Sequence, residues 1–176
     1  MSMSNDTEKQ EWAAANQLGP NSIPKPSESS DGGASFWIYP VRSLGEESAQ
    51  EVVKTLVAKE GIFAFGERTP GRKHLKPGDW ICFYATGSGV VAHAKVLSYP
   101  ERKSHPRVGY LWDYPWVFAL GEANLYLNDP VVIDGRVRAW LDSFKNRDPN
   151  RAWAWFVHST RRISRHDFEI LTRNRC

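Results

Sequence analysis

The chain has little cysteine and no pattern of residues that would bind a metal. Its two cysteines, Cys82 and Cys176, form neither a disulfide framework nor a metal-ligand spacing, so we expect a reducing, cytoplasmic environment. Cys82 is expected to be a small buried hydrophobic residue. No apolar run is long enough to cross a bilayer, and residues 1–9 lack the apolar region of a secretory signal. We therefore expect no membrane partner.

Recognisable catalytic motifs are missing as well. The sequence has no P-loop, no Gly-x-Ser-x-Gly, no His-x-Glu motif with a cysteine pair and no clustered carboxylates for a nuclease metal. Its histidines are scattered: His93 falls within an expected strand, and His166 with Asp167 fits the start of a helix. We predict no catalytic residue, no metal and no cofactor, and hence a protein that is not an enzyme.

The sequence does have one domain's length, many tryptophans and an uneven charge. Residues 1–33 are rich in Ser, Pro, Asn, Glu and Gly and carry a net charge of −3, which predicts a disordered acidic and polar tail before a domain at 34–176. Because the whole chain carries +3, this domain carries +6, which is compatible with a polyanionic partner. Eight tryptophans are many for a chain of this length. Some must serve the core, and a surplus at the surface would suit stacking on flat ligands.

Short apolar and aromatic runs between turn residues predict a mostly stranded domain. Strands are expected at 36–39, 62–65, 80–85, 90–97 and 116–127, with an extended piece at 131–133 and a late strand or helical turn at 153–158. A capping box at Ser43 and Glu46 predicts a helix that ends before Gly61. Further helices are expected at 135–144 and after Ser164. This order indicates an α+β domain on a small, curved or closed sheet.

The ordered series of elements resembles the EVE domains of the PUA-like superfamily, which are relatives of the YTH domains. The resemblance spans about residues 35–171. It is carried by the aromatic strand ending at Pro40, the capped helix, the step Phe65-Gly66, the turn Gly78-Asp79 before 81–84, the strand before Ser98, and the segment 161–171. It implies a PUA-like β-barrel of five to six strands with flanking helices. Where many relatives have a tryptophan, this chain has Phe65.

The same resemblance implies a non-catalytic domain that reads a modified base in DNA or RNA, flipped into an aromatic pocket at the barrel mouth. Some EVE domains accompany defence modules, which implies a nuclease or RNA-processing partner protein. A base pocket needs aromatic walls and polar groups at the base edge. The candidates for it are Tyr39, Phe65, Gly66, Glu67, Arg68, Tyr84, Ser98, Trp112 and Trp116, with Thr69 and Asp113 as further polar candidates.

Two basic loops predict the phosphate contacts of this pocket. Clustered cations neutralise phosphates and make binding dependent on salt. The candidates are Arg72, Lys73 and His74 in the first loop and Arg102, Lys103 and Arg107 in the second, joined by Lys76 and His105; Arg161, Arg162 and Arg165 form a third cluster.

The sequence leaves other interpretations open. The aromatic candidates are also compatible with barrel core, and the charged candidates with solvated loops. At the level of function, the alternatives are a structured-RNA-binding module that flips no base, or a small-molecule or nucleoside enzyme that uses the same cleft. Neither the base nor the kind of nucleic acid follows from the sequence.

Overall fold

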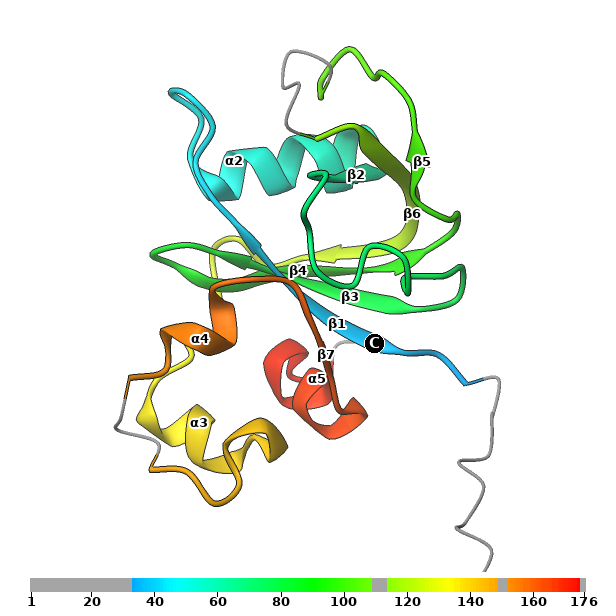
Figure 1. The fold of residues 1–176 in the computed structure, drawn as a ribbon. Helices are drawn as coiled ribbons and strands as arrows, with labels where there is room; N and C mark the ends of the chain where they lie inside the picture. The colour runs from blue at the N-terminus through cyan, green and yellow to red at the C-terminus, as the bar shows by residue number, and fades with distance from the viewer. Residues whose placement is uncertain (1–32, 109–113, 149–151, 175–176) are drawn as a thin grey trace, which may run out of the picture. The chain divides into compact units, whose positions relative to one another are not determined.

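The computed structural model describes residues 33–108, 114–148 and 152–174, and Figure 1 shows their arrangement. Of the predicted tail, all but Gly33 lies outside these residues, as do Trp112 and Asp113. The strands are β1 (Phe36–Val41), β2 (Ile62–Phe65), β3 (Trp80–Ala85), β4 (Gly89–Val96), β5 (Glu101–Arg102), β6 (Trp116–Leu125) and β7 (Arg161–Ile163). The helices are α2 (Ala49–Val53) with its π-helical continuation η1 (Lys54–Lys59), α3 (Gly135–Trp140), the 3₁₀ turn η2 (Asp142–Phe144), α4 (Ala154–Val157) and α5 (Arg165–Thr172).

The strands form one mixed sheet in the order β2-β6-β4-β3-β1-β7, with β5 added beside β6. Strands β1 and β3 are parallel, and the other pairs are antiparallel. The first half of β6 pairs with β2 and the second half with β4, so the sheet bends along β6. Because of this bend, Tyr39 of β1 touches Phe63 and Phe65 of β2, although β1 and β2 are not paired. The sheet is thus curled into a half-barrel, which confirms the predicted class of small α+β barrel.

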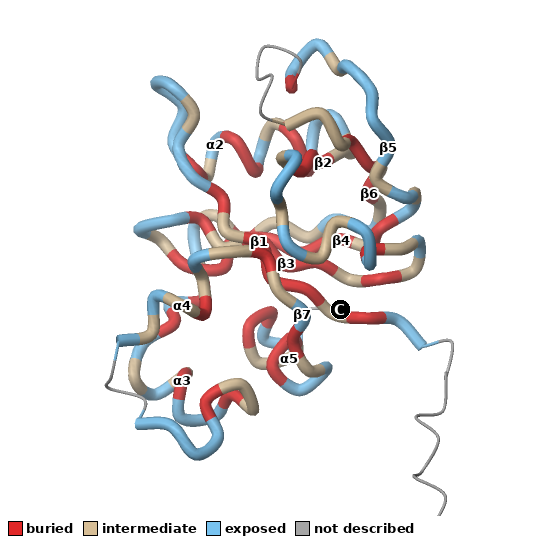
Figure 2. The backbone as a smooth tube through the Cα atoms, viewed as in Figure 1, coloured by how far each residue is buried: buried red, intermediate tan, exposed pale blue. Residues whose placement is uncertain are grey.

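Each face of the sheet packs against its own helices because side chains alternate along each strand. On β1, Trp37, Tyr39 and Val41 face the first core, which also contains the apolar residues of α2 and η1. Ile38 faces the second core, which contains residues of α4 and α5. Figure 1 shows α2 on one side of the sheet and α3, α4 and α5 on the other, and Figure 2 shows the central strands buried between them.

Several local predictions are confirmed, and others are wrong. The hairpin of β3 and β4, the strand at 62–65 and the cap at Ser164 are confirmed, and Cys82 is fully buried. The capping box predicted at Ser43 is wrong. Leu44 and Glu47 instead form a small bridge, and the box is made by Ser48 and Glu51 at the start of α2.

Two later segments also differ from their predicted form. Residues 154–157 form the short helix α4, so the strand favoured at 153–158 is wrong and the helical turn is found. The helix expected at 135–144 is interrupted at Leu141, where the backbone is extended with ψ at 133°, and it resumes as the turn η2. The side chain of Leu141 is buried in the second core, so the interruption of the helix lies at a residue that packs into the interior.

A buried aspartate fixes the long loop between β2 and β3. The carboxylate of Asp79 accepts hydrogen bonds from the Ser35 amide at 2.8 Å, the Trp37 indole at 3.0 Å and the Lys76 amide at 3.1 Å. In the middle of this loop, Gly71 has φ at +77°, and a Cβ there would lie 2.5 Å from the Trp37 ring. Because both residues contact Trp37, they hold the loop against the beginning of β1.

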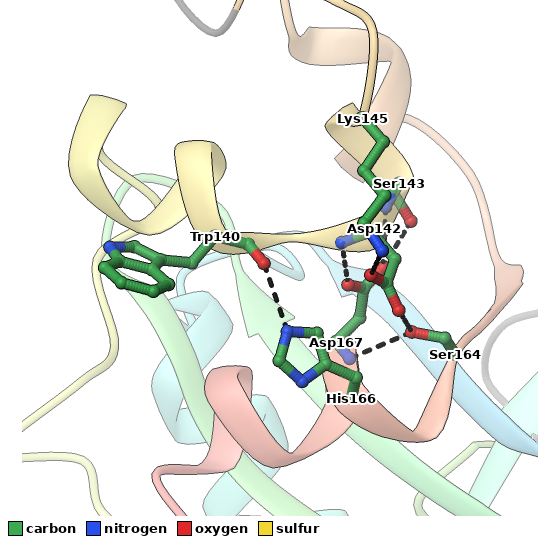
Figure 3. Close-up of polar contacts among 7 residues, drawn as sticks. All are labelled: Trp140, Asp142, Ser143, Lys145, Ser164, His166 and Asp167. Atoms are coloured by element: carbon green, nitrogen blue, oxygen red, sulfur yellow. Dashed lines mark hydrogen bonds and ion pairs between the residues drawn. The ribbon is translucent and has the colours of Figure 1, made fainter.

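A second buried aspartate joins the helices on the opposite face of the sheet. The carboxylate of Asp167 in α5 accepts hydrogen bonds from the backbone amides of Asp142 and Ser143 and from the Ser143 hydroxyl (Figure 3). Ser164, the N-cap of α5, also donates to Asp142 at 2.8 Å. The pair His166-Asp167, which the sequence explained by capping alone, therefore also ties α5 to η2.

Within the described residues, no helix has the length and apolar character to span a bilayer.

Candidate nucleic-acid interface

A cavity of about 1220 Å³ opens on the face of the sheet that carries α2. It lies where the end of β1, the end of β2, the helix α2–η1 and the segment before β6 meet, and the loop before β7 forms another side. The described residues that line it come from 39–44, 47–56, 63–70, 102–108, 114–115 and 158–160. The chain segments are far apart in sequence, so only the curled sheet brings them together.

Tyr39 supplies an aromatic surface and a polar group to this cavity. Its ring stacks on Phe65 with centroids 5.4 Å apart and an interplanar angle of 18°, and it meets the edge of Phe63 at 4.9 Å. Burial raises the pKa of the Tyr39 hydroxyl, the nearby Tyr114 raises it further, and Arg42 lowers it. The hydroxyl is therefore neutral at ordinary pH. Among the described residues it has no hydrogen-bond partner, so it is available to a ligand.

Arginines dominate the charge of the cavity lining. In the part of the chain that the structure describes, four arginines and two glutamates line it: Arg42, Arg68, Arg102, Arg107, Glu47 and Glu67. Arg102 lies 3.8 Å from Glu67, and Arg107 lies 3.7 Å from Glu60. Arg42 and Arg68 are exposed and form no ion pair with any described residue. The lining thus has an excess of positive charge that an anionic ligand could neutralise.

Glu67 connects the cavity lining to Trp116 and Arg72. The Trp116 indole donates a 2.8 Å hydrogen bond to Oε2 of Glu67, and the Arg72 guanidinium carbon lies 4.0 Å from the centroid of the Trp116 ring. Arg72 also lies 3.9 Å from Oε1 of Glu67. The Arg72 side chain is only 14% exposed, so this cation–π contact occurs at a partly desolvated site, where such contacts are stronger.

The structure brings together some of the predicted site residues and separates others. Of the predicted base pocket, Tyr39, Gly66, Glu67 and Arg68 line the cavity, as does the further candidate Thr69; of the predicted phosphate contacts, Arg102 and Arg107 line it. The residues found outside it are Phe65, Tyr84, Ser98, Trp116, Arg72, Lys73, His74 and Lys103. Trp112 and Asp113 lie outside the described residues.

Three of the predicted pocket residues outside the cavity have structural contacts elsewhere. Phe65 is fully buried between Tyr39 and Phe118, so it supports the cavity wall from behind. Tyr84 lies against the second core on the other face of the sheet, with its ring 6.5 Å from that of Trp153. The Ser98 hydroxyl accepts a hydrogen bond from the Ala119 amide at 2.9 Å, which joins the segment after β4 to β6.

Several lining residues were not predicted from the sequence, among them Arg42, Tyr114, His158 and Thr160. Tyr114 stands between Trp112 and Trp116, so the aromatic character of this segment was the signal that pointed to it. Arg42 follows the strand that ends with Tyr39, and its position was a weaker signal. His158 and Thr160 had no local signal because they join the cavity only through the pairing of β7 with β1.

No family model matches the chain, and no curated protein matches it. Among solved structures, it is similar to the YTH domain of Zygosaccharomyces rouxii MRB1 in complex with N6-methyladenosine RNA, at 15% identity and a TM-score of 0.48, over 80% of this chain and 86% of that one. It is similar to the YTH domain-containing protein mmi1 in complex with RNA, at 12% identity and a TM-score of 0.47, over 81% and 79%. It is also similar to protein Atu2648 from Agrobacterium tumefaciens, at 18% identity and a TM-score of 0.45, over 80% and 92%. At such identities and scores, evidence for a ligand has to come from this chain's own residues.

Proposed function

We propose that this domain binds nucleic acid without catalysing a reaction, and that its cavity receives one flipped-out, modified base. The observation that carries the proposal is the composition of the lining: two tyrosines and four arginines around one opening. Aromatic rings provide a stacking surface for a base, and arginines bind the phosphates on either side of it. The resemblance to EVE domains in the sequence supports the same assignment.

Within this proposal, Tyr39 and Tyr114 are the aromatic surface. Tyr39 is held by Phe63 and Phe65, so its ring is already in place before a ligand arrives. Its neutral hydroxyl is a hydrogen-bond donor or acceptor for the edge of a base. Glu67 is a candidate acceptor for an exocyclic amine, as on cytosine or adenine, because one of its oxygens accepts only the Trp116 indole and a carboxylate has further acceptor sites.

Arg42 and Arg68 are the proposed phosphate contacts at this opening, because neither is neutralised by a described carboxylate. Arg102 and Arg107 contribute less, since each is already close to a glutamate. Replacing Arg42 or Arg68 by glutamine should weaken binding about equally for modified and unmodified oligonucleotides and should reduce its salt dependence. Arg136→Gln is the matched control: this exposed arginine lies in α3 and does not line the cavity.

The test compares binding of single-stranded and double-stranded DNA and RNA, with and without one methylated cytosine or adenine, at two salt concentrations. Tyr114→Ala should weaken binding of the preferred modified oligonucleotide about tenfold, because stacking contributes roughly 1–3 kcal/mol per base. Tyr99→Ala, which truncates a tyrosine that is 62% exposed and outside the cavity, should leave binding unchanged.

Four outcomes would contradict parts of the proposal. Equal affinity for every oligonucleotide would remove the modified base. If the arginine variants weaken binding and Tyr114→Ala does not, structured-RNA binding without a flipped base replaces base reading. No affinity at either salt concentration would remove nucleic acid as the ligand. Recovery of chemically altered oligonucleotide after incubation would show that the domain is an enzyme.

A further inference from the structure

A second cluster of arginine and aromatic side chains lies away from the cavity. The guanidinium carbons of Arg147 and Arg161 lie 4.5 Å and 4.7 Å from the Trp155 ring. None of the three residues lines the cavity. Arg161 pairs with Ile38 in the ladder between β7 and β1, and Ile38 faces the second core, so this cluster belongs to the face of the sheet opposite α2.

The Arg161 side chain is held by one hydrogen bond and lies where burial and a neighbouring cation disfavour its charge. Its Nη2 donates a 2.6 Å hydrogen bond to the Trp155 carbonyl, and its head lies 5.7 Å from the Phe156 ring. Its Nε is buried and has no acceptor among the described residues. Burial lowers the pKa of Arg161, and the charge of Arg147 lowers it further. Both effects oppose placing a charged guanidinium here.

No described carboxylate offsets the repulsion between these two arginines. Other arginines on this side of the chain have acidic partners: Arg165 lies 2.8 Å from Glu169, and Arg173 lies 2.6 Å from Asp129. Arg147 and Arg161 form no ion pair with any described residue. Two cations on one indole, with no carboxylate beside them in the described part of the chain, are more readily explained by an external anion than by a contribution to folding.

We propose that the guanidinium groups of Arg147 and Arg161 form a phosphate-binding site supported by Trp155. A guanidinium is planar and carries several N–H donors for phosphate oxygens, and stacking on an indole fixes its plane. At Arg161 the available donors are the Nη hydrogens that Trp155 does not accept, because Nε is buried. The phosphate comes either from a nucleic-acid backbone or from a small phosphorylated molecule. A backbone is compatible with the fold, because residues 158–160 line the cavity and Arg161 follows directly. This site does not depend on base reading in the cavity.

The first experiment uses inorganic phosphate as the probe and the indole N–H signal of Trp155 in NMR as the readout, with chloride at equal ionic strength as the reference. The signal should shift and saturate with phosphate but not with chloride. Arg147→Gln should weaken this response at least tenfold. Arg147 is exposed, so the variant should fold. Arg162→Gln is the matched control because this arginine is exposed, lies next to Arg161 on β7 and contacts no described aromatic ring; it should respond as the wild type does.

The second experiment identifies the source of the phosphate with unmodified DNA and RNA oligonucleotides. For a backbone contact, Arg147→Gln should lower the slope of log affinity against log salt by about one, and Arg162→Gln should lower it less. A response to inorganic phosphate without an effect on oligonucleotides assigns the site to a small phosphorylated ligand.

The proposal is overturned if phosphate does not move the Trp155 signal beyond the chloride reference, or if Arg147→Gln behaves as Arg162→Gln does. Tyr114→Ala separates this site from the cavity. That variant should change base discrimination and leave the Trp155 response to phosphate intact. If the wild-type domain and all variants bind modified and unmodified oligonucleotides equally, the proposed base reading is contradicted. The proposed phosphate site is not affected by that result.

Discussion

The Trp116 indole and the Glu67 carboxylate, 49 residues apart in sequence, are joined by a 2.8 Å hydrogen bond. This bond connects the start of β6 to the loop after β2, and Glu67 also lies within 4 Å of Arg72 and Arg102. One carboxylate therefore holds an aromatic ring and two cations at the edge of the cavity. Its role follows from this arrangement whichever ligand the cavity takes.

Trp116→Phe should lower the free energy of unfolding by about 1 kcal/mol, because it removes the indole donor and keeps a ring beneath Arg72. Denaturant unfolding measures the change. A double-mutant cycle with Glu67→Ala, which removes the acceptor, should show coupling between the two positions. Trp140→Phe is the control, since the Trp140 side chain is 73% exposed, and it should change stability by less than about 0.5 kcal/mol. Additive effects at positions 116 and 67 would show that the bond contributes nothing.

Asp79→Asn should destabilise the domain by about 3 kcal/mol. The fully buried carboxylate accepts from three N–H groups, and an asparagine would direct its own amide hydrogens at one of those donors. Denaturant unfolding is again the measurement. Asp129→Asn, which alters an exposed ion pair with Arg173, should change stability by less than about 1 kcal/mol. If both substitutions have the same small effect, Asp79 does not fix the loop.

Gly71→Ala should destabilise the domain more than Gly87→Ala, by roughly 1–3 kcal/mol. Both glycines have positive φ, at +77° and +86°, so backbone strain is similar in the two variants. A Cβ at position 71 would also lie 2.5 Å from Trp37, whereas nothing lies within 4 Å at position 87. The difference between their midpoints of thermal unfolding isolates the clash. Equal midpoints would mean that Trp37 moves aside freely.

Tyr39 should make stability decrease at alkaline pH. Its pKa is raised in the folded domain, mainly by burial, above the ordinary value of 10.0. As pH rises, the unfolded chain therefore loses this proton before the folded domain does. The contribution of Tyr39 to the free energy of unfolding is fully present below about pH 10 and is lost as pH rises further, by up to about 1.4 kcal/mol per pH unit. Tyr39→Phe should remove most of this dependence. The raised pKa of Tyr84 leaves a smaller dependence of the same sign. Unfolding free energies measured at several pH values check this, and parallel curves for the two proteins would contradict it.

The sequence by itself determined the local elements of this protein. Alternation and β-branched or aromatic composition located most strands, and turn chemistry located the β3–β4 hairpin and the cap at Ser164, because these signals act over a few residues. It failed at residues 43–48, where two serines each precede a glutamate by three positions and only packing decides which one caps the helix. It also favoured a strand over the helix α4, because a short apolar run fits both.

Only the tertiary structure decided which side chains share a site. Phe65 and Tyr39 were both credible pocket walls in the sequence, and the bend of the sheet along β6 buries the first behind the second. The cavity joins segments from residue 39 to residue 160, and Trp155 gathers Arg147 and Arg161 on the opposite face. Such groupings depend on which strands pair and which face each side chain takes. These are properties of long-range contacts, and no spacing along the chain records them.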